Sequence, residues 1–523
     1  MKLVTSKQMR ELDRETIAGF GVSGEELMDR AGLGVAKTVE QLAKVSGLGH
    51  NCPVLLFAGR GNNGGDTFAA ARHLKQHGFN PEVWLTMESK TVSGDSMKHF
   101  GKMMAEKVKM QELPGIRDWD DAMTAKCISG GILVDGILGT GTSGPARGPV
   151  AGAIQFINKL AGENLVVAID VPSGLDPDTG LSEGGAVFAD VTVTMGLPKT
   201  GLIEPAAIEY VGAIDLVDIG IPHELLDKVE SDRELVTASD LRGLLKRRAR
   251  NSHKGTYGHI LIIGGAAGYA GAVSLAARAA VRSGVGLVTV LTPKSVAPVV
   301  AGCVPEAMVH SASEVQAGSF TFDCLDKWGR DINDFDAVLI GPGMTTQDQV
   351  KLLVHRILKT CRKPLVMDAD ALNVCVGSVD LLQKVAGPVV ITPHPGEMAR
   401  LLNWTVEQVQ ANRFHTATTA RDFTGATVVL KGAGTIIASR EKPLNVSLAG
   451  NPGMAKGGMG DVLGGVIVGL VGQGLELFDA ARTGVYLHNR AADNVALRSS
   501  QSGMNAGDVA NELANVFREI TAR

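Results

Sequence analysis

Short, unbroken runs of apolar residues alternate with helical segments along the first half of the chain. The runs cover residues 53–59, 82–86, 132–138, 165–171 and 190–196. Because strands buried on both faces read as continuous apolar runs, this pattern predicts a largely parallel sheet covered by helices. Two helices are expected before the first run. One begins at Thr5, where Gln8 completes a capping box, and the other covers residues 25–44.

A polar, charged segment over residues 222–255 interrupts this pattern, and a second α/β series follows it. The second series contains the runs HILIIGG, GLVTVLT, DAVLIGPG, KPLVMDAD, PVVITPHPGE and TVVLKGAGT, and it is not a repeat of the first. We therefore predict one α/β domain over residues 1–225, a linker over 226–235 and a second α/β domain over 236–523.

One apolar stretch, residues 255–277, contains no Asp, Glu, Lys or Arg and imitates a membrane span. Its four glycines at 264, 265, 268 and 271 follow a short β-like run. This order favours a buried strand, a tight turn and the start of a helix.

Composition narrows the classes of protein that fit these patterns. The chain has 523 residues, of which 65 are glycine, without the repeats of a fibrous protein. Its net charge of −4 predicts neither a nucleic-acid partner nor a membrane partner. Six cysteines are scattered without a C-x-x-C pair, and the first residues lack an apolar signal core. We therefore expect buried thiols in a cytoplasmic protein, rather than disulfides or a zinc site.

The first candidate site follows the run at 53–59, where the sequence Gly59–Asp66 reads GRGNNGGD and leads into a helix. Glycines let a ligand approach the main chain, and a helix N-terminus attracts an anion such as a pyrophosphate. The spacing also satisfies the dinucleotide fingerprint, with Glu88 as the acidic residue beyond it. The alternative is a tight turn capped by Asp66.

Polar residues also end two neighbouring runs, with Asp135 in VDGILGTGTSGPARG and with Asp170 and Ser173 in AIDVPSGLD. Ligands bind beyond the carboxyl ends of the strands of an open parallel sheet. Asn63, Asp135 and Ser173 would offer oxygen ligands to a cation there, and Asp170 would act as a general acid or base. Alternatively, the two aspartates only cap the next helix or loop.

These three phrases together resemble the NAD(P)H-hydrate epimerase family, which has a Rossmann-like three-layer fold. The resemblance implies that Asp170 moves the proton and that Asn63, Asp135 and Ser173 bind potassium. It further implies that the hydrated cofactor is bound by Asn62, Asn63, Gly64, Gly65, Asp66, Gly139, Thr140, Gly141, Thr142, Ser143, Gly144, Pro145 and Asp170. The same domain type also serves as a non-catalytic module in other proteins, and the Asn and Asp residues present here favour the enzyme.

In the second half, the loop GNPGMAKGGMGD ends at Asp461 and leads into an apolar helix. Such a loop offers main-chain N–H groups to an anion, and Asp461 would accept the proton of a substrate hydroxyl during phosphoryl transfer. Asp461 as a plain helix cap is the alternative. Upstream strand ends carry Lys431–Thr435, Asp368, Asp370, Asn373, His394 and Glu397, each of which is also compatible with a turn or a cap.

The phrases HKGTYGHILIIGG, DADALN, TPHPGE, KGAGT and GNPGMAKGGMGD resemble the ADP- or ATP-dependent NAD(P)H-hydrate dehydratase family, of ribokinase-like α/β fold, over residues 235–523. The resemblance implies a hydrated-cofactor site and a nucleotide site, with Mg²⁺ as the metal. The cofactor would contact Ala272, Gly343, His394 and Asp461. The nucleotide would contact Lys431, Gly432, Ala433, Gly434, Thr435 and Gly460.

The order of the two domains also resembles that of bacterial bifunctional enzymes that repair hydrated nicotinamide cofactors. The first domain would interconvert the R and S hydrates of NADH and NADPH (NADHX and NADPHX), and the second would dehydrate the S form with ADP or ATP. We expect a homo-oligomer. A ribokinase-type small-molecule kinase fused to a non-catalytic Rossmann-like module is the alternative.

Overall fold

The computed structural model describes residues 1–119, 128–141, 144–245 and 247–521. The chain divides into two compact units. The N-terminal unit is Lys2–Asp232, and the C-terminal unit is Met1 with Arg233–Arg523. The segment predicted as a linker, residues 226–235, contains the end of one helix and a short strand.

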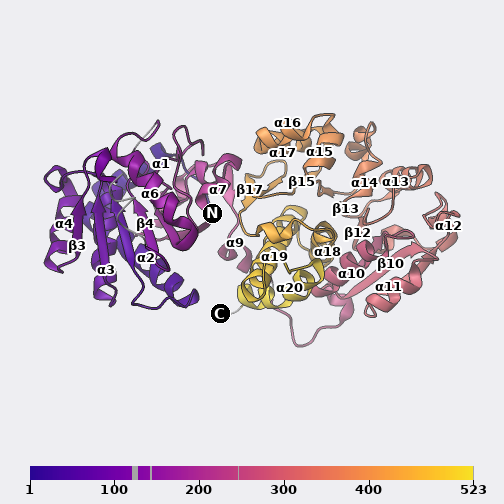
Figure 1. Ribbon diagram of the computed structural model, residues 1–523. Helices are drawn as coiled ribbons and strands as arrows, with labels where there is room; N and C mark the ends of the chain where they lie inside the picture. Colours follow the sequence, from indigo (N-terminus) through magenta and orange to yellow (C-terminus); the bar gives the residue numbers. More distant parts are fainter. Residues whose placement is uncertain (120–127, 142–143, 246, 522–523) are drawn as a thin grey trace. The chain divides into compact units, whose positions relative to one another are not determined.

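A seven-stranded parallel sheet forms the centre of the N-terminal unit, in the order β3-β2-β1-β4-β5-β6-β7. Figure 1 draws this unit in indigo to magenta. The strands are β1 (Val54–Ala58), β2 (Pro81–Leu85), β3 (Lys109–Glu112), β4 (Ile132–Gly136), β5 (Leu165–Ile169), β6 (Val191–Met195) and β7 (Ala213–Val217). The order reverses between β1 and β4, so this is a doubly wound sheet with its switch point there.

Helices cover both faces of this sheet. They are α1 (Ser6–Phe20), α2 (Gly24–Val45), α3 (Asn62–Gln76), α4 (Gly94–Ala105), α6 (Pro149–Leu160), α7 (Ile208–Val211) and α8 (His223–Lys228). Leu55 and Phe57 of β1 pack with α6 on one face, while α3 contacts β1, β2 and β4. The predicted capping box is confirmed, because the hydroxyl of Thr5 accepts the N–H of Gln8.

The five predicted strands of the first half are β1, β2, β4, β5 and β6. The prediction missed β3 and β7, the two edge strands. Both are partly exposed and carry polar residues, so neither reads as an apolar run.

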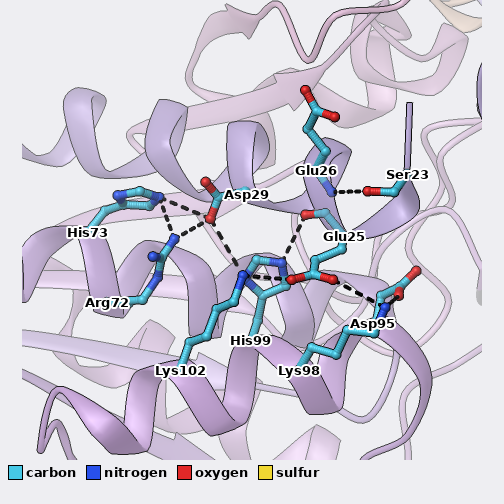
Figure 2. A network of polar contacts seen from close by, with 10 residues as sticks. All are labelled: Ser23, Glu25, Glu26, Asp29, Arg72, His73, Asp95, Lys98, His99 and Lys102. Atoms are coloured by element: carbon cyan, nitrogen blue, oxygen red, sulfur yellow. Dashed lines mark hydrogen bonds and ion pairs between the residues drawn. The ribbon is translucent and has the colours of Figure 1, made fainter. Parts of the chain in front are cut away.

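A polar network ties α2, α3 and α4 together (Figure 2). Asp29 on α2 lies 3.4 Å from Nε2 of His73 on α3. From α4, the ring of His99 is 3.0 Å from the carbonyl of Glu25, and Lys102 donates to the carboxylate of Glu25 at 2.7 Å. The contact of Asp29 with His73 joins α2 to α3, whose first turn carries residues predicted to bind a cofactor.

The C-terminal unit contains a ten-stranded sheet in the order β11-β10-β9-β12-β13-β14-β15-β16-β17-β8. Pairing is parallel from β11 to β15 and antiparallel through β15, β16 and β17. The strands are β8 (Arg233–Leu235), β9 (His259–Ile263), β10 (Leu287–Pro293), β11 (Met308–Ala312), β12 (Ala337–Ile340), β13 (Leu365–Met367), β14 (Val389–Ile391), β15 (Thr427–Leu430), β16 (Thr435–Ala438) and β17 (Leu444–Ser447). The six predicted runs are β9, β10, β12, β13, β14 and β15.

Four helices pack against this sheet in one apolar core: α10 (Ala270–Arg282), α18 (Met459–Gly472), α19 (Leu477–Arg498) and α20 (Ala506–Thr521). Further helices are α9 (Ala238–Arg242), α11 (Ala297–Cys303), α12 (Cys324–Trp328), α13 (Asp348–Thr360), α14 (Asp370–Asn373), α15 (Pro395–Leu402), α16 (Val406–Ala411) and α17 (Arg413–Thr424). A Cβ on Gly465 would lie 2.1 Å from the carbonyl oxygen of Ala276, so this glycine lets α18 approach α10 closely.

The apolar stretch 255–277 forms the predicted strand, turn and helix, as β9 and α10. No helix in the described part of the chain is both long and apolar enough to cross a membrane. Of the cysteines, Cys52, Cys324, Cys361 and Cys375 are buried free thiols, as expected. Cys303 is a free thiol as well but is exposed, because it ends the short helix α11 at the surface, and Cys127 lies outside the described residues.

Candidate active sites

The loop after β1 turns directly into a helix at the switch point of the N-terminal sheet. Helix α3 begins at Asn62, and its N-cap is Gly61, which has no side chain to cap it. The alternative in which Asp66 caps the helix is therefore wrong, since Asp66 lies inside α3. A Cβ on Gly64 would lie 1.7 Å from the carbonyl oxygen of Gly59, so the close strand-to-helix turn requires glycine.

A cavity of about 890 Å³ opens at this end of the sheet. Its walls include seven of the residues predicted to bind the cofactor: Asn62, Asn63, Asp66, Gly139, Thr140, Gly141 and Asp170. Gly64, Gly65, Gly144 and Pro145 do not line it, and Thr142 and Ser143 lie outside the described residues. The size suits a large ligand, since small-molecule sites occupy about 300–1,000 Å³.

The three residues predicted to bind potassium are joined through Leu138. The hydroxyl of Ser173 donates to Asp135 at 2.6 Å and accepts the N–H of Leu138 at 2.8 Å. The amide nitrogen of Asn63 donates to the carbonyl of Leu138 at 2.6 Å. The amide oxygen of Asn63 is buried and accepts no hydrogen bond from the described residues. An oxygen left without a donor fits a cation such as K⁺.

Asp170 follows β5 with a positive φ of 64°, a conformation that non-glycine residues rarely adopt. Its carboxylate lies 2.5 Å from the ammonium group of Lys199, whose side chain is only 1% exposed. Lys199 also donates to the hydroxyl of Thr194 at 3.2 Å and to the carbonyl of Met195 at 3.0 Å. These contacts hold Asp170 in a strained conformation, and such strain is common at functional sites.

Two further carboxyl groups, Asp13 and Asp66, line the same cavity as Asp170 and Lys199. Burial raises the pKa of Asp13 to about 6, against the opposing effect of Lys199. Burial and the charges of Asp170 and Asp13 raise the pKa of Asp66 well above its ordinary value. This end of the sheet therefore holds a carboxylate paired with a lysine beside two carboxyl groups that bind protons more tightly than usual.

In the C-terminal unit, Asp461 lies in the first turn of α18, where the predicted glycine-rich loop ends. The N-cap of α18 is Gly458, so the alternative in which Asp461 caps the helix is wrong. Burial and the negative charge of Asp368 raise the pKa of Asp461 to about 7, against the attraction of Lys431. A carboxylate with this pKa can accept a proton near neutral pH.

Lys431 lies next to Asp461 but points its ammonium group into an acidic pair. Its Nζ is 2.7 Å from Asp368 and 3.8 Å from Glu397. A Cβ on Gly460 would lie 3.0 Å from that Nζ, so glycine leaves room for the lysine. The structure thus brings together Asp461, Gly460 and Lys431 among the predicted residues.

Two other polar residues near this point accept main-chain hydrogen bonds. Asp370 accepts the N–H of Thr345 at 2.8 Å and lies in the first turn of α14. His394 is the N-cap of α15: its Nδ1 accepts the N–H of Gly396 at 3.0 Å, and its ring is half exposed. Burial and the charge of Lys431 lower the pKa of His394, which favours the neutral ring, and its Nε2 lies 3.5 Å from the carboxylate of Glu397.

The remaining predicted contacts lie in two places. A Cβ on Gly343 would lie 3.2 Å from the Cβ of Ala272, so these two residues are neighbours. The loop Lys431–Thr435 follows β15, and beneath it lies the buried Arg413, whose Nη2 donates to the carbonyls of Leu430, Lys431 and Gly434 at 3.2–3.3 Å.

Known proteins resemble this chain over its full length. Residues 24–201 match the family model described as YjeF-related protein N-terminus, and residues 260–515 match that described as NAD(P)H-hydrate dehydratase. The bifunctional NAD(P)H-hydrate repair enzyme Nnr of Moorella thermoacetica is 38% identical over 523 residues, which cover 99% of this chain and 97% of the relative. The chain belongs to the bifunctional NAD(P)H-hydrate repair enzyme family. The resemblance inferred from the motifs is therefore confirmed, and so is the predicted fold class.

Other members of the repair enzyme family match almost as widely. The enzyme of Escherichia coli is 34% identical, and the match covers 98% of this chain and 93% of that relative. Among solved structures, an ADP/ATP-dependent NAD(P)H-hydrate dehydratase from Bacillus subtilis is 30% identical with a TM-score of 0.48. The match covers 54% of this chain and 97% of the chain in that structure.

Three residues of the sites in this repair enzyme family member were not predicted from the sequence. Lys199 lies shortly after the predicted strand over 190–196, and its position beyond a strand end was a usable signal. Asp13 lies in the first helix and Arg413 in α17, outside every glycine-rich motif. No sequence pattern marked these two, since only the packing of the chain brings them to the sites.

Proposed function

We propose that this chain repairs hydrated NADH and NADPH in two reactions, one in each unit. The N-terminal unit interconverts the R and S epimers at the carbon that carries the added hydroxyl. The C-terminal unit dehydrates the S epimer to NAD(P)H with ADP or ATP. The placement of Asp461 carries the proposal: this carboxylate, with a pKa of about 7, lies at the start of α18 where a glycine-rich loop offers main-chain N–H groups to phosphates.

Dehydration needs a better leaving group than hydroxide. Asp461 removes the proton of the C6 hydroxyl, and the oxygen attacks the terminal phosphorus of the nucleotide. The bond from that phosphorus to the rest of the nucleotide breaks, and ADP leaves from ATP or AMP leaves from ADP. The ring nitrogen then donates its lone pair, and phosphate leaves with the C6–O electrons. Loss of a proton from C5 restores the ring double bond and the reduced cofactor.

The nucleotide phosphates require a counter-charge in addition to main-chain N–H groups. A bound Mg²⁺ would neutralise them. Among the described residues, no group of three or more His, Cys, Asp and Glu side chains is placed to hold a metal ion. The oxygens of Asp368, Asp370 and Glu397 are the acidic groups near Asp461, so the ion would be held mainly by phosphates and water, with few protein ligands.

For the epimerase site, the proposal includes K⁺ bound by Asn63, Asp135 and Ser173. The unpartnered amide oxygen of Asn63 supports this assignment, because an oxygen buried without a donor is costly. Such an ion would fix the loop after β4 against α3 and the loop after β5, since Leu138 of the first loop bonds Asn63 and Ser173.

We place the protein in the cytoplasm as a homo-oligomer. The free thiols among the described cysteines are consistent with a reducing compartment. Light scattering coupled to gel filtration measures the oligomeric state.

One assay tests the proposed function. Purified full-length protein is mixed with a racemic hydrate of NADH and with ADP or ATP in separate arms, and the absorbance at 340 nm is followed. Recovery of more than half of the hydrate as NADH, matched by nucleotide consumption, is expected, because epimerisation feeds the R form to the dehydratase. A stable phosphorylated product without NADH would favour the ribokinase-type alternative.

A further inference from the structure

Asp13 lies on α1 and lines the same cavity as Asp170, yet one of its carboxyl oxygens has no partner. Its Oδ1 is buried and makes no hydrogen bond with any residue that the structure describes. A buried polar atom without a partner costs free energy, and it is retained where a ligand completes it. The free oxygen therefore points to a contact with the bound substrate.

Lys199 does not satisfy Asp13, because its hydrogen bonds are already committed. An ammonium group has three N–H donors. Lys199 directs them to Asp170, to the hydroxyl of Thr194 and to the carbonyl of Met195. The lysine thus makes the two carboxyl groups unequal: Asp170 has a cationic partner at 2.5 Å, and Asp13 has none.

We propose that Asp13 is the second proton-transfer residue of the epimerase site, working opposite Asp170, and that Lys199 positions Asp170 as the proton acceptor. This inference rests on the proposed function of the N-terminal unit. It assigns the site a general acid and a general base, which inversion of a hydroxyl-bearing carbon next to a ring nitrogen requires.

The epimerisation proceeds by opening and closing of the ring. Asp170 removes the proton of the C6 hydroxyl, the O–H electrons form a C=O bond, and the C6–N1 bond breaks. The electron pair of that bond stays on N1, which takes a proton from Asp13. After rotation about the C5–C6 bond, N1 attacks the other face of the carbonyl. Asp13 recovers its proton and Asp170 returns its proton to the oxygen, so the pair is restored in each turnover.

Asp66, the other carboxyl group of the cavity, is less suited to this role. Its pKa is raised well above the ordinary value by burial and by the charges of Asp170 and Asp13. A group that keeps its proton can bind the substrate but cannot donate and recover a proton in each turnover. The pKa of Asp13, raised to about 6, lies closer to the working pH, as general acid–base catalysis requires.

The test compares Asp13→Asn with Glu11→Gln in the full-length protein. Glu11 is an exposed carboxylate on the same helix, paired with Arg14 and absent from the cavity wall. Epimer exchange of purified R hydrate is followed by chromatography, and dehydration of S hydrate is measured in the same preparation. For Asp13→Asn we expect a loss of kcat of at least about 100-fold, with KM changed less than threefold and dehydration unchanged.

The pH profile separates proton transfer from a structural role. In the parent, exchange should fall as pH rises above about 6, when Asp13, which faces Lys199, Asp170 and Asp66, loses its proton. Asp13→Asn should lack this limb, and Asp13→Glu should restore part of the rate with a displaced limb. Parental kcat in Asp13→Asn, or a loss confined to Asp66→Asn, would overturn the inference. Absence of exchange in the parent itself would instead contradict the proposed function.

Discussion

The ammonium group of Lys431 lies 2.7 Å from the carboxylate of Asp368, a side chain that is only 1% exposed. Glu397 lies 3.8 Å from the same ammonium group, so one lysine serves two buried carboxylates. Asp461 is close enough to feel all three charges but forms no ion pair with the lysine in the described structure. Burial and the negative charge of Asp368 raise its pKa to about 7, which suits the base proposed for the dehydration.

Asp461→Asn should separate the two activities. Dehydration of S hydrate should fall at least about 100-fold, because the amide cannot accept the hydroxyl proton. Epimer exchange should stay at the parental rate, since Asp461 belongs to the C-terminal unit. Asp170→Ala should give the reverse pattern. Equal loss of both activities in either variant would contradict the division of labour.

The rate of dehydration should follow the ionisation of Asp461. Since the base must be deprotonated, kcat should rise with pH up to about 7 and then level off. Stability should move the other way. The folded state binds the proton more tightly than the unfolded chain, so this carboxylate costs stability as pH rises from about 4 to 7.

This linkage predicts that Asp461→Asn is more stable than the parent at pH 8, by on the order of a few kcal/mol of unfolding free energy. The variant should therefore unfold at a higher temperature. The difference should vanish near pH 4. Thermal denaturation across this range checks both statements. A variant less stable than the parent at pH 8 would show that the ionised carboxylate does not destabilise the folded state.

Breaking the pair of Lys431 with Asp368 should destabilise the C-terminal unit. Lys431→Met leaves Asp368 buried without its cation, which costs about 3–5 kcal/mol in comparable sites. The double variant Lys431→Met with Asp368→Asn should recover most of that loss, because the buried charge is gone. Chemical denaturation measures each variant, and additive losses in the double variant would indicate that the two residues do not interact.

Arg413 should act on nucleotide affinity from beneath the loop Lys431–Thr435. Arg413→Met removes the shared donor of three main-chain carbonyls, so the loop should lose its fixed shape. We expect the KM for nucleotide to rise about tenfold, a cost of about 1.4 kcal/mol, with kcat at saturation near the parental value. Arg421→Met, on the same helix and paired with Asp422, is the control. A fall in kcat alone would place Arg413 elsewhere in the mechanism.

Potassium should bind the N-terminal unit and support only epimerisation. Replacing K⁺ by tetramethylammonium should slow epimer exchange and leave dehydration unchanged. Binding itself is measured without activity: K⁺ should raise the melting temperature of the parent but not that of the isosteric variant Asp135→Asn. An equal rise in both proteins would indicate that the ion binds elsewhere.

Much of this protein was predictable because its signals are local. Strands buried on both faces appear as apolar runs. A glycine-rich turn follows β1, and a glycine-rich loop precedes α18. The family resemblance rests on such contiguous phrases. The edge strands β3, β7 and β11 were missed, because an exposed strand has no unbroken apolar run. The strands β8, β16 and β17 were missed as well, and each has only three or four residues.

The sequence by itself therefore determined the fold class, the two α/β halves, the loop that carries Asp170 and the glycine-rich loop that leads to Asp461. Only the tertiary structure decided which charges surround them. Lys199 and Asp13 reach the cavity from segments 186 residues apart, and Arg413 reaches its loop from a different helix. The physical reason is that pKa values and ion pairs depend on burial and on distances through space, which packing sets and local sequence does not encode.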